Sequence, residues 1–231
     1  LPICHGGYMN GSRYYGEDLP INTWYMKRFA GLSEDGLSLW YYTDKETNEE
    51  KTTTTYSTGD FYLCGDPNPD LYGGFGTSIT FHGFDLSTQF SYLVGGLTYD
   101  YGYAGMMGNP TATSVGNRWH KDVLKAWSPE NPSSTIPRWY FNDLNTTGSS
   151  DRFLIDGSYL NLQNIQVGYT LPDSWTSHLK IKNLRLYFVC DNVYYWSKRK
   201  GLDPRRSISG VGTSGKIAPF RTYSGGISLQ F

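Results

Sequence analysis

The sequence predicts an all-β chain whose antiparallel strands form part of a transmembrane β-barrel. Several segments alternate apolar and polar residues with a period of two, which is the pattern of strands that meet a different environment on each face. The connections between these segments are alternately short and long. The last alternating segment runs to an aromatic residue at the end of the sequence, Phe231. Together these features favour the wall of a barrel.

The composition agrees with strands and turns and argues against several other classes. Of the 231 residues, 27 are glycine and 20 are tyrosine, and charged residues make up 18%, against about 25% in an average domain. The net charge of −1 lacks the basic excess of a nucleic-acid-binding protein. The mean hydropathy of −0.49, without a run of 18 apolar residues, argues against a membrane-spanning helix.

About seven strands are expected, and the clearest is residues 220–231. There one face carries Tyr223, Ile227 and Leu229, and the other carries serine, glycine, threonine and glutamine. Residues 71–81 and 84–94 alternate in the same way, and His82-Gly83 between them predicts a two-residue hairpin. The other expected strands are residues 165–171 and 184–188, with weaker patterns at 21–30 and 37–42.

The strand around residue 165 contains an irregularity. Ile165 and the apolar residues after it share one phase, whereas Leu160 and Leu162 fall on the other. Either a β-bulge near Gln163 or a change of environment at that point explains the shift.

The lengths of the connections indicate an orientation. The short connections are residues 31–36, 82–83 and 172–180, and the long ones are residues 43–70, 96–157 and 197–219. Outer-membrane barrels have short periplasmic turns and longer extracellular loops, so the C-terminus is expected in the periplasm. One short loop helix is predicted at residues 114–127, with Ser114 as its N-cap. Because seven strands leave sheet edges unpaired in lipid, further strands are expected upstream of Leu1.

A series of short motifs occurs in a fixed order from about Tyr15 to Phe231. The motifs are DPNPDLYGGF at residues 66–75, GFDL at 83–86, WSPENP at 127–132, IPR at 136–138, RFLIDGSYLNLQNI at 152–165, GYTLP at 168–172, LRLY at 184–187, DN at 191–192, KGLDP at 200–204 and PFRTYSGGISLQF at 219–231. With these motifs in this order, the sequence resembles the SusC/RagA family of TonB-dependent outer-membrane transporters. The family's usual acidic loop is replaced by KETNEEKTTTTYSTG at residues 45–59, so no metal site is expected.

The resemblance implies active uptake through a 22-stranded barrel in the Gram-negative outer membrane. In this family an N-terminal plug closes the barrel, a SusD-like surface lipoprotein covers its mouth, and TonB displaces the plug. Substrates are typically oligosaccharides or peptides. Residues 1–231 would form the C-terminal portion of such a receptor, with the plug, the TonB box and the remaining strands upstream. The implied protein is not an enzyme, so no catalytic residue and no cofactor is expected.

Two sets of residues are candidates for function. The terminal face with Phe231 would be recognised by the barrel-assembly machinery through strand addition and would then contact outer-membrane lipid; an ordinary buried strand is the alternative. Aromatic residues in the long loops could stack on substrate or contact the lipoprotein, or could form the loops' own small core or an interfacial girdle. The terminal set is Tyr223, Ile227, Leu229 and Phe231, and the loop set is Tyr101, Tyr103, Trp119, Trp127, Trp139 and Tyr140.

Other patterns carry less information. Asp66, Asn68 and Asp70 have the spacing of a calcium loop but lack its glycine and its final glutamate. The three cysteines are far apart and are expected to be inert thiols. A basic cluster at residues 198–206 could meet lipopolysaccharide phosphates or an acidic partner, or could simply be solvated.

Two other classes of protein compete with the transporter. A secreted β-sandwich that binds carbohydrate would share the aromatic composition and would bury Phe84, Ile165 and Ile227 between two sheets. A glycoside hydrolase would need a pair of carboxylates across a cleft, and no such pair can be singled out.

Overall fold

The computed structural model describes residues 6–111, 118–143, 148–176, 181–198, 203–206, 210 and 219–231. The chain divides into two compact units. Unit 1 comprises residues 1–68, 96–156 and 206–215, and unit 2 comprises residues 69–95, 157–205 and 216–231. In the described part of the chain, no helix has the length and apolarity needed to cross a membrane.

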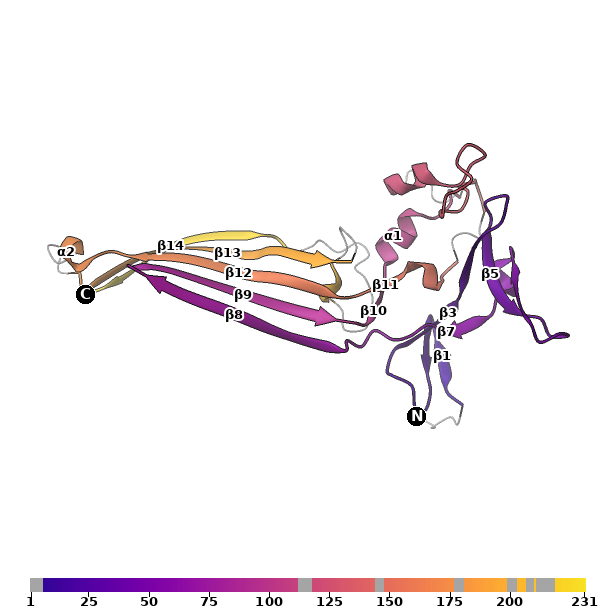
Figure 1. The fold of residues 1–231 in the computed structure, drawn as a ribbon, viewed down its shortest axis with the longest axis horizontal. Helices are drawn as coiled ribbons and strands as arrows, with labels where there is room; N and C mark the ends of the chain where they lie inside the picture. The colour runs from indigo at the N-terminus through magenta and orange to yellow at the C-terminus, as the bar shows by residue number, and fades with distance from the viewer. Residues whose placement is uncertain are drawn as a thin grey trace. The chain divides into compact units, whose positions relative to one another are not determined.

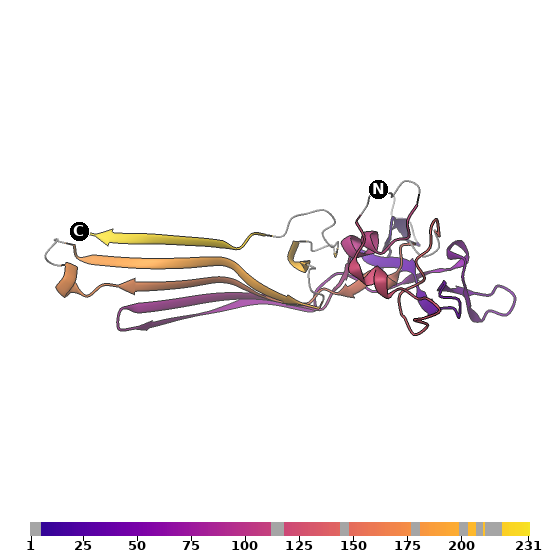
Figure 2. The same cartoon turned by 90° about the horizontal axis from the view of Figure 1, so that it is seen from above.

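Unit 2 is built on one antiparallel sheet of five long strands (Figures 1 and 2). The strands lie side by side in the order β14-β13-β12-β9-β8, so each strand pairs with its neighbour in the meander. They have 9 to 15 residues, which is longer than the usual 5–6. Along the chain, a short helix, α2 (Asp173–Thr176), follows β12 and precedes β13. The strands are β8 (Leu71–Phe81), β9 (Phe84–Val94), β12 (Tyr159–Thr170), β13 (Asn183–Ser197) and β14 (Thr222–Gln230).

The hairpin between β8 and β9 has the predicted two-residue loop. Phe81 pairs directly with Phe84. His82 and Gly83 both have positive φ angles, 46° and 84°, as a type I′ turn requires. A Cβ on Gly83 would also lie 2.7 Å from the carbonyl oxygen of Thr170. The sequence prediction of a tight hairpin is confirmed.

The irregularity in β12 is a β-bulge. The register shifts between Leu162 and Asn164 in the pairing with β9 and also in the pairing with β13, and Gln163 is left without a partner in either. Leu162 faces Phe90 and Ile165 faces Thr88, two residues earlier on β9. The bulge therefore brings the apolar residues before and after it to the same face of the sheet.

Unit 1 contains three small antiparallel sheets. Its helix α1 (Tyr101–Met106) is capped at its N-terminus by Asp100, whose carboxylate accepts a hydrogen bond from the backbone N–H of Tyr103. Short 3₁₀ helices lie at Tyr56–Thr58, Lys121–Lys125 and Asp151–Phe153, and another at Pro204–Arg206 lies where the chain passes between the units. The sheets are β1 (Tyr8–Asn10), β2 (Arg13–Tyr15), β3 (Thr23–Lys27) and β7 (Phe61–Leu63); β4 (Phe29–Leu32), β5 (Ser38–Thr43) and β6 (Glu50–Thr53); and β10 (Leu97–Tyr99) with β11 (Leu154–Asp156).

A small aromatic core holds unit 1 together. Trp24 is fully buried, packs 5.8 Å from the ring of Tyr99, and donates its indole N–H to the carbonyl oxygen of Leu97 at 3.1 Å. Lys27 is also buried, and its ammonium group donates to the carbonyl oxygens of Tyr56 and Ser57 at 2.5 and 3.1 Å. These long-range contacts stabilise segments that have little regular structure of their own.

The structure corrects two sequence expectations. The weak patterns at 21–30 and 37–42 do form strands, but as β3, β4 and β5 of unit 1, so the long sheet has five strands among the described residues and not seven. The helix expected at 114–127 begins outside the described residues, and its described part has only the 3₁₀ helix Lys121–Lys125. The α-helix of unit 1, Tyr101–Met106, was missed because its two glycines and two tyrosines have low helix propensity.

Candidate functional site: a two-faced strand wall and an aromatic loop cluster

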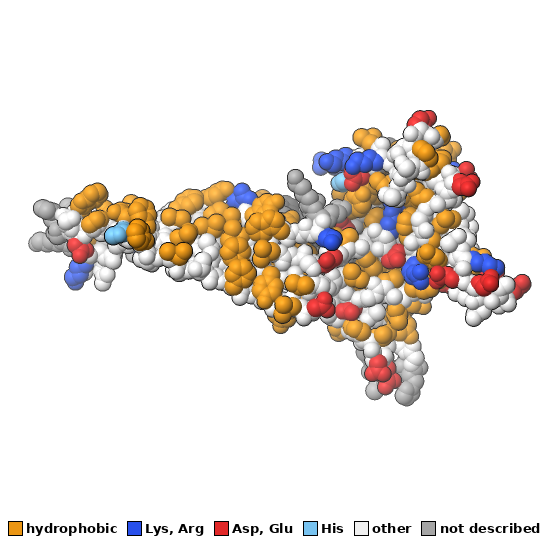
Figure 3. Space-filling model, viewed as in Figure 1, with side chains coloured by type: hydrophobic (Ala, Val, Ile, Leu, Met, Phe, Trp, Pro, Cys, Tyr) orange, Lys and Arg blue, Asp and Glu red, His pale blue; other side chains and the backbone are white. Residues whose placement is uncertain are grey.

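One face of the unit 2 sheet is an exposed apolar surface. Phe81, Phe84, Tyr169, Leu186 and Ile227 form one continuous row across all five strands, each paired directly with the next. Phe84 and Ile227 are 57% and 65% exposed. Figure 3 shows apolar side chains gathered over these strands. Soluble proteins rarely expose a contiguous apolar surface of this kind, whereas lipid-facing barrel strands do.

This exposure decides between the barrel and the sandwich. Unit 2 contains a single sheet among its described residues, and the large side chains of its apolar face are not buried against a second one. A β-sandwich buries these positions between two sheets. The alternative of a sandwich module that binds carbohydrate is therefore wrong for this chain.

The opposite face is polar and carries an ion pair that crosses three strands. Arg185 on β13 reaches over β12 to Asp85 on β9, with distances of 2.9 Å from Nε to Oδ1 and 2.5 Å from Nη2 to Oδ2. Gly168 on β12 pairs with Asp85 and with Tyr187, and the side chains of Asp85 and Arg185 meet over it. A Cβ there would lie 2.4 Å from Oδ1 and 2.5 Å from Nη2, so only glycine leaves room for the pair. Such a bidentate pair suits a watery lumen and not hydrocarbon.

The terminal residues lie as predicted on the apolar face. Ile227 pairs with Leu186 and Leu229 with Leu184, and Phe231 follows the end of β14 with 74% of its surface exposed. Among the described residues β14 pairs only with β13, so its second edge is open. Their role as an assembly signal stays a prediction.

An aromatic cluster in unit 1 is centred on the carbonyl oxygen of Gly108. Trp119 and Trp139 both donate their indole N–H groups to this oxygen, at 3.1 and 3.3 Å, and their rings meet edge to face at 5.5 Å. Tyr140 and Phe141 follow and are 64% and 58% exposed. The structure thus brings Trp119 and Trp139 together and presents the next two rings to the surface. We call Trp119, Trp139, Tyr140 and Phe141 the aromatic loop cluster.

Backbone contacts hold this cluster in place. The N–H of Arg138 donates to the carbonyl oxygen of Gly36 at 2.9 Å, and the N–H of Asn142 donates to that of Pro110 at 2.7 Å. The buried amide of Asn109 donates to the carbonyl oxygen of Asp143 at 3.1 Å. Because both ends of the aromatic run are tied to other segments, its rings are displayed from a fixed backbone.

The other three predicted loop aromatics pack against other parts of unit 1, and Tyr101 is 38% exposed. Tyr103 packs against Phe153 at 6.2 Å and donates its hydroxyl to Asp122 at 3.2 Å. Tyr101 lies 4.4 Å from Tyr99. Trp127 covers Gly36, where a Cβ would lie 2.3 Å from its ring. These contacts favour the alternative of a small loop core for Tyr103, which packs against the buried cluster. Sequence reasoning missed Phe141, although the run of three aromatic residues at 139–141 would have been a signal.

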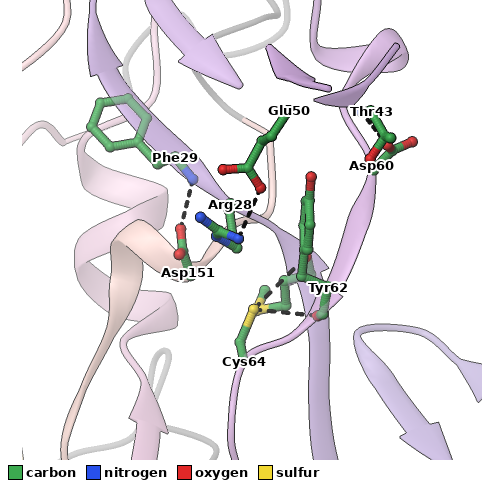
Figure 4. A network of polar contacts seen from close by, with 9 residues as sticks. Arg28, Phe29, Thr43, Glu50, Asp60, Tyr62, Cys64 and Asp151 are labelled. Carbon is green, nitrogen blue, oxygen red and sulfur yellow. Dashed lines mark hydrogen bonds and ion pairs between the residues drawn. The ribbon is translucent and has the colours of Figure 1, made fainter. Parts of the chain in front are cut away.

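A polar network in unit 1 is structural in character (Figure 4). Arg28 forms an ion pair with Glu50 at 3.3 Å, and its guanidinium also lies over the ring of Tyr62. The carboxylate of Asp151 accepts a hydrogen bond from the N–H of Phe29 at 2.8 Å, and burial raises the pKa of this carboxyl group.

Cys64, which also belongs to this network, is not an activated nucleophile. Burial, and secondarily the charge of Asp151, raises the pKa of its thiol to about 11. The thiol lies 3.3 Å from the carbonyl oxygen of Tyr62 as a hydrogen-bond donor. At neutral pH the residue is therefore a protonated, unreactive thiol. Among the described residues, no group of three or more His, Cys, Asp or Glu side chains could hold a metal ion.

Comparison with known proteins places this geometry in a class. The chain is 29% identical over 235 residues to TonB-dependent receptor P3 of Formosa agariphila, covering 97% of this chain and 22% of the relative. It is 27% identical over 180 residues to TonB-dependent receptor SusC of Bacteroides thetaiotaomicron, covering 77% and 17%. No family model matches the chain. The chain thus spans about a fifth of the length of these curated relatives.

Solved structures agree on the fold. The RagAB peptide importer in its closed-closed state matches 97% of this chain and 25% of the solved chain, with a TM-score of 0.80 and 24% identity. Its open-open state matches 97% and 24%, with a TM-score of 0.78 and 26% identity. The two-faced antiparallel wall and the relatives named TonB-dependent receptors place the chain in the class of TonB-dependent outer-membrane receptors. The similarity to SusC and to the RagAB structures agrees with the SusC/RagA resemblance of the motifs.

Proposed function

We propose that this chain forms part of the wall and of the extracellular surface of an importer that carries oligosaccharides or peptides across the outer membrane. The observation that supports this most strongly is the single five-stranded sheet, apolar and exposed on one face and polar with an Asp85–Arg185 ion pair on the other. One face would contact lipid and the other would line the lumen. A protein of this kind acts by binding and gated passage and not by catalysis.

The connections of the sheet support one orientation in the membrane. The hairpin at His82-Gly83 and the connection with α2 join strands at one end, and β14 also finishes at that end, because Gln230 pairs with Asn183. The segments of unit 1 continue from the opposite end of the strands. We place the short connections and the C-terminus in the periplasm and unit 1 outside the cell.

The partners in this proposal are those of a complete receptor. TonB would act through a plug encoded by sequence upstream of residue 1, and a SusD-like lipoprotein would cover the extracellular mouth. The barrel-assembly machinery would pair with the open edge of β14 and read Tyr223, Ile227, Leu229 and Phe231. The RagAB structures are named as those of a peptide importer, which supports peptides as one substrate class.

The aromatic loop cluster is the proposed contact of unit 1 with substrate or with the lipoprotein. Tyr140 and Phe141 expose large rings on a backbone tied at both ends. Rings of this kind bind sugar faces, apolar side chains or a protein surface at a low cost in side-chain entropy.

Uptake by cells that carry the full receptor tests the proposal. The probes are a mixture of isotope-labelled oligopeptides and a mixture of labelled malto-oligosaccharides, each supplied with and without a protonophore. We expect energy-dependent uptake of one mixture, lost when the receptor gene is deleted. Equal uptake of both mixtures by deletion and parent strains, with the receptor assembled in the parent, would contradict import of these substrates.

A pair of variants tests the loop cluster. Replacing Trp139 and Tyr140 together by alanine should reduce uptake several-fold while leaving the amount of assembled receptor unchanged. Trp175→Ala is the matched control, because Trp175 is 68% exposed but lies in α2, at the other end of the sheet from the long connections. Equal uptake by the two variants would contradict a role of the cluster in binding.

A further inference from the structure

The apolar face of the unit 2 sheet ends in a pair of aromatic side chains. Tyr194 pairs with Leu162 of β12, and Leu162 pairs with Phe90 of β9. Because directly paired residues share a face, Tyr194 lies on the apolar face. Trp196, two residues later, lies on the same face, and the two rings meet at 4.9 Å with an angle of 66°. They are 50% and 48% exposed. Amphipathic rings at the end of a lipid-facing band are typical of the membrane–water interface.

Two cations lie on the same face near the aromatic pair. Arg221 is exposed and precedes Tyr223 by two residues, which puts it in the apolar phase of β14, and it interacts with the Tyr223 hydroxyl. Lys198 is exposed and follows Trp196 by two residues. Among the described side chains, no carboxylate forms an ion pair with Arg221.

A cavity of about 570 Å³ lies where these groups meet. It occupies a step in the sheet, because β14 pairs with β13 only as far as Thr222 opposite Asp191, while β13 continues to Ser197 paired with β12 alone. Tyr194, Trp196 and Arg221 all line it.

A second arginine in the cavity wall is already engaged. Arg205 donates to both carboxylate oxygens of Asp203, each at 2.8 Å, and to the side-chain oxygen of Asn161 at 2.7 Å. Its guanidinium also lies 4.6 Å from the centre of the Tyr195 ring. With its donors used in this way, Arg205 stiffens the wall, and Arg221 is the lining cation left to bind a ligand.

We propose that this cavity binds the phosphate group of a membrane lipid, with Arg221 at the phosphate and with Tyr194 and Trp196 beside the headgroup. An arginine offers two parallel N–H donors that match phosphate oxygens. A soluble anion would gain nothing from two rings on the face shared with Leu186 and Phe188, so the combination fits an anionic amphiphile. The inference rests on the proposed membrane orientation, which makes the lipid one of the outer leaflet.

The test uses the full receptor, purified in detergent and freed of bound lipid. Its affinity is measured for phosphorylated lipid A, for the same lipid without phosphate, and for inorganic phosphate. We expect Arg221→Gln to weaken binding of phosphorylated lipid A about tenfold, the loss of one charge-assisted interaction, and to leave the dephosphorylated lipid unaffected. Trp196→Ala should weaken both lipids. Lys125→Gln, which removes a charge from a side chain of unit 1 that is 73% exposed, is the matched control and should change neither.

The outcomes separate this inference from the proposed function. Equal affinity of the parent and Arg221→Gln for phosphorylated lipid A, or equal affinity of the parent for both lipids, would overturn the inference. If inorganic phosphate binds as tightly as the lipid, the cavity is a site for a soluble anion and the inference is overturned. A parent receptor that shows no heat-modifiable mobility and is absent from the outer-membrane fraction would contradict the barrel itself, and with it both proposals.

Discussion

The sharpest test of the two-faced wall is to place one new charge on each face of the same strand. Ile227 and Ser228 are neighbours on β14, and they pair with Leu186 and Arg185 on β13. Ile227→Asp puts a carboxylate on the apolar face, where Ile227 is 65% exposed. Ser228→Asp puts the same group on the polar face, opposite an arginine, where an opposite-charge pair is neutral to mildly stabilising.

The size of the effect follows from the position of Ile227 along the strand. Thr222 lies five residues before it and Gln230 three residues after it, or about 16 and 10 Å at about 3.3 Å per residue. With a strand tilt of about 40°, these become about 13 and 8 Å along the membrane normal. The position is therefore inside an apolar band about 25 Å tall, where a charge costs roughly 1–3 kcal/mol. This corresponds to about a 5- to 150-fold loss in the folding equilibrium.

The assay measures the full receptor in outer-membrane fractions. The folded fraction is the part whose electrophoretic mobility changes on heating. We expect Ile227→Asp to lower the ratio of folded to unfolded receptor at least about fivefold and Ser228→Asp to leave this ratio close to that of the parent. Equal losses for the two variants, or a larger loss for Ser228→Asp, would refute the assignment of the faces.

Three further predictions concern contacts that the tertiary structure creates. Gly168→Val should separate Arg185 from Asp85, because a Cβ there would lie 2.4 Å from the carboxylate. The folded receptor should then convert to its unfolded electrophoretic mobility at a lower temperature. Lys27→Met should destabilise unit 1 by about 1–3 kcal/mol, because the carbonyl oxygens of Tyr56 and Ser57 lose a donor on a buried side chain; the loss should be seen as faster proteolysis. Cys64 should resist iodoacetamide at pH 9 and react faster towards about pH 11, because burial raises the pKa of its thiol to about 11. The thiol ionises at a lower pH in the unfolded chain than in the folded protein, so the free energy of unfolding should fall as the pH rises from 9 to about 11.

Each of these predictions has a matched control. Gly225→Ala adds a Cβ whose nearest contact is 3.9 Å away, and a loss equal to that of Gly168→Val would show that the ion pair is not responsible. Lys51→Met removes an ion pair whose lysine side chain is 40% exposed and should cost less than about 1 kcal/mol; an equal effect would contradict the role of burial at Lys27. For alkylation, Cys4→Ser and Cys190→Ser leave one thiol, and rapid modification of the folded protein at pH 9 would contradict a shielded Cys64.

The sequence predicted the long strands of unit 2 well because their signal is local. Alternation with a period of two follows from strand geometry alone. The glycine of His82-Gly83 can take the positive φ that a two-residue hairpin needs. The irregularity near Gln163 was visible as a change of phase, but a bulge and a change of environment both explained it until the register showed the bulge.

The sequence was less informative for unit 1. Residues 21–30 and 37–42 have the pattern of strands, and they form them, but a short pattern does not say to which sheet a strand belongs. The partners of β3 and β5 lie in β2, β7, β4 and β6, all short. The choice between the long sheet and the small sheets depends on the buried core around Trp24 and Trp40, to which distant segments contribute.

By itself, the sequence determined that the chain would be built of strands with one apolar and one polar face, since every second side chain of a strand points to the same side. Only the tertiary structure decided which side chains meet across strands and loops. It placed Arg185 over Gly168 against Asp85, turned the indoles of Trp119 and Trp139 to one carbonyl oxygen, and packed Tyr103 against the core. It also engaged Arg205 while leaving Arg221 exposed. The reason is that periodicity is fixed by the backbone of a single segment, whereas such contacts depend on the register and packing of segments far apart in the chain.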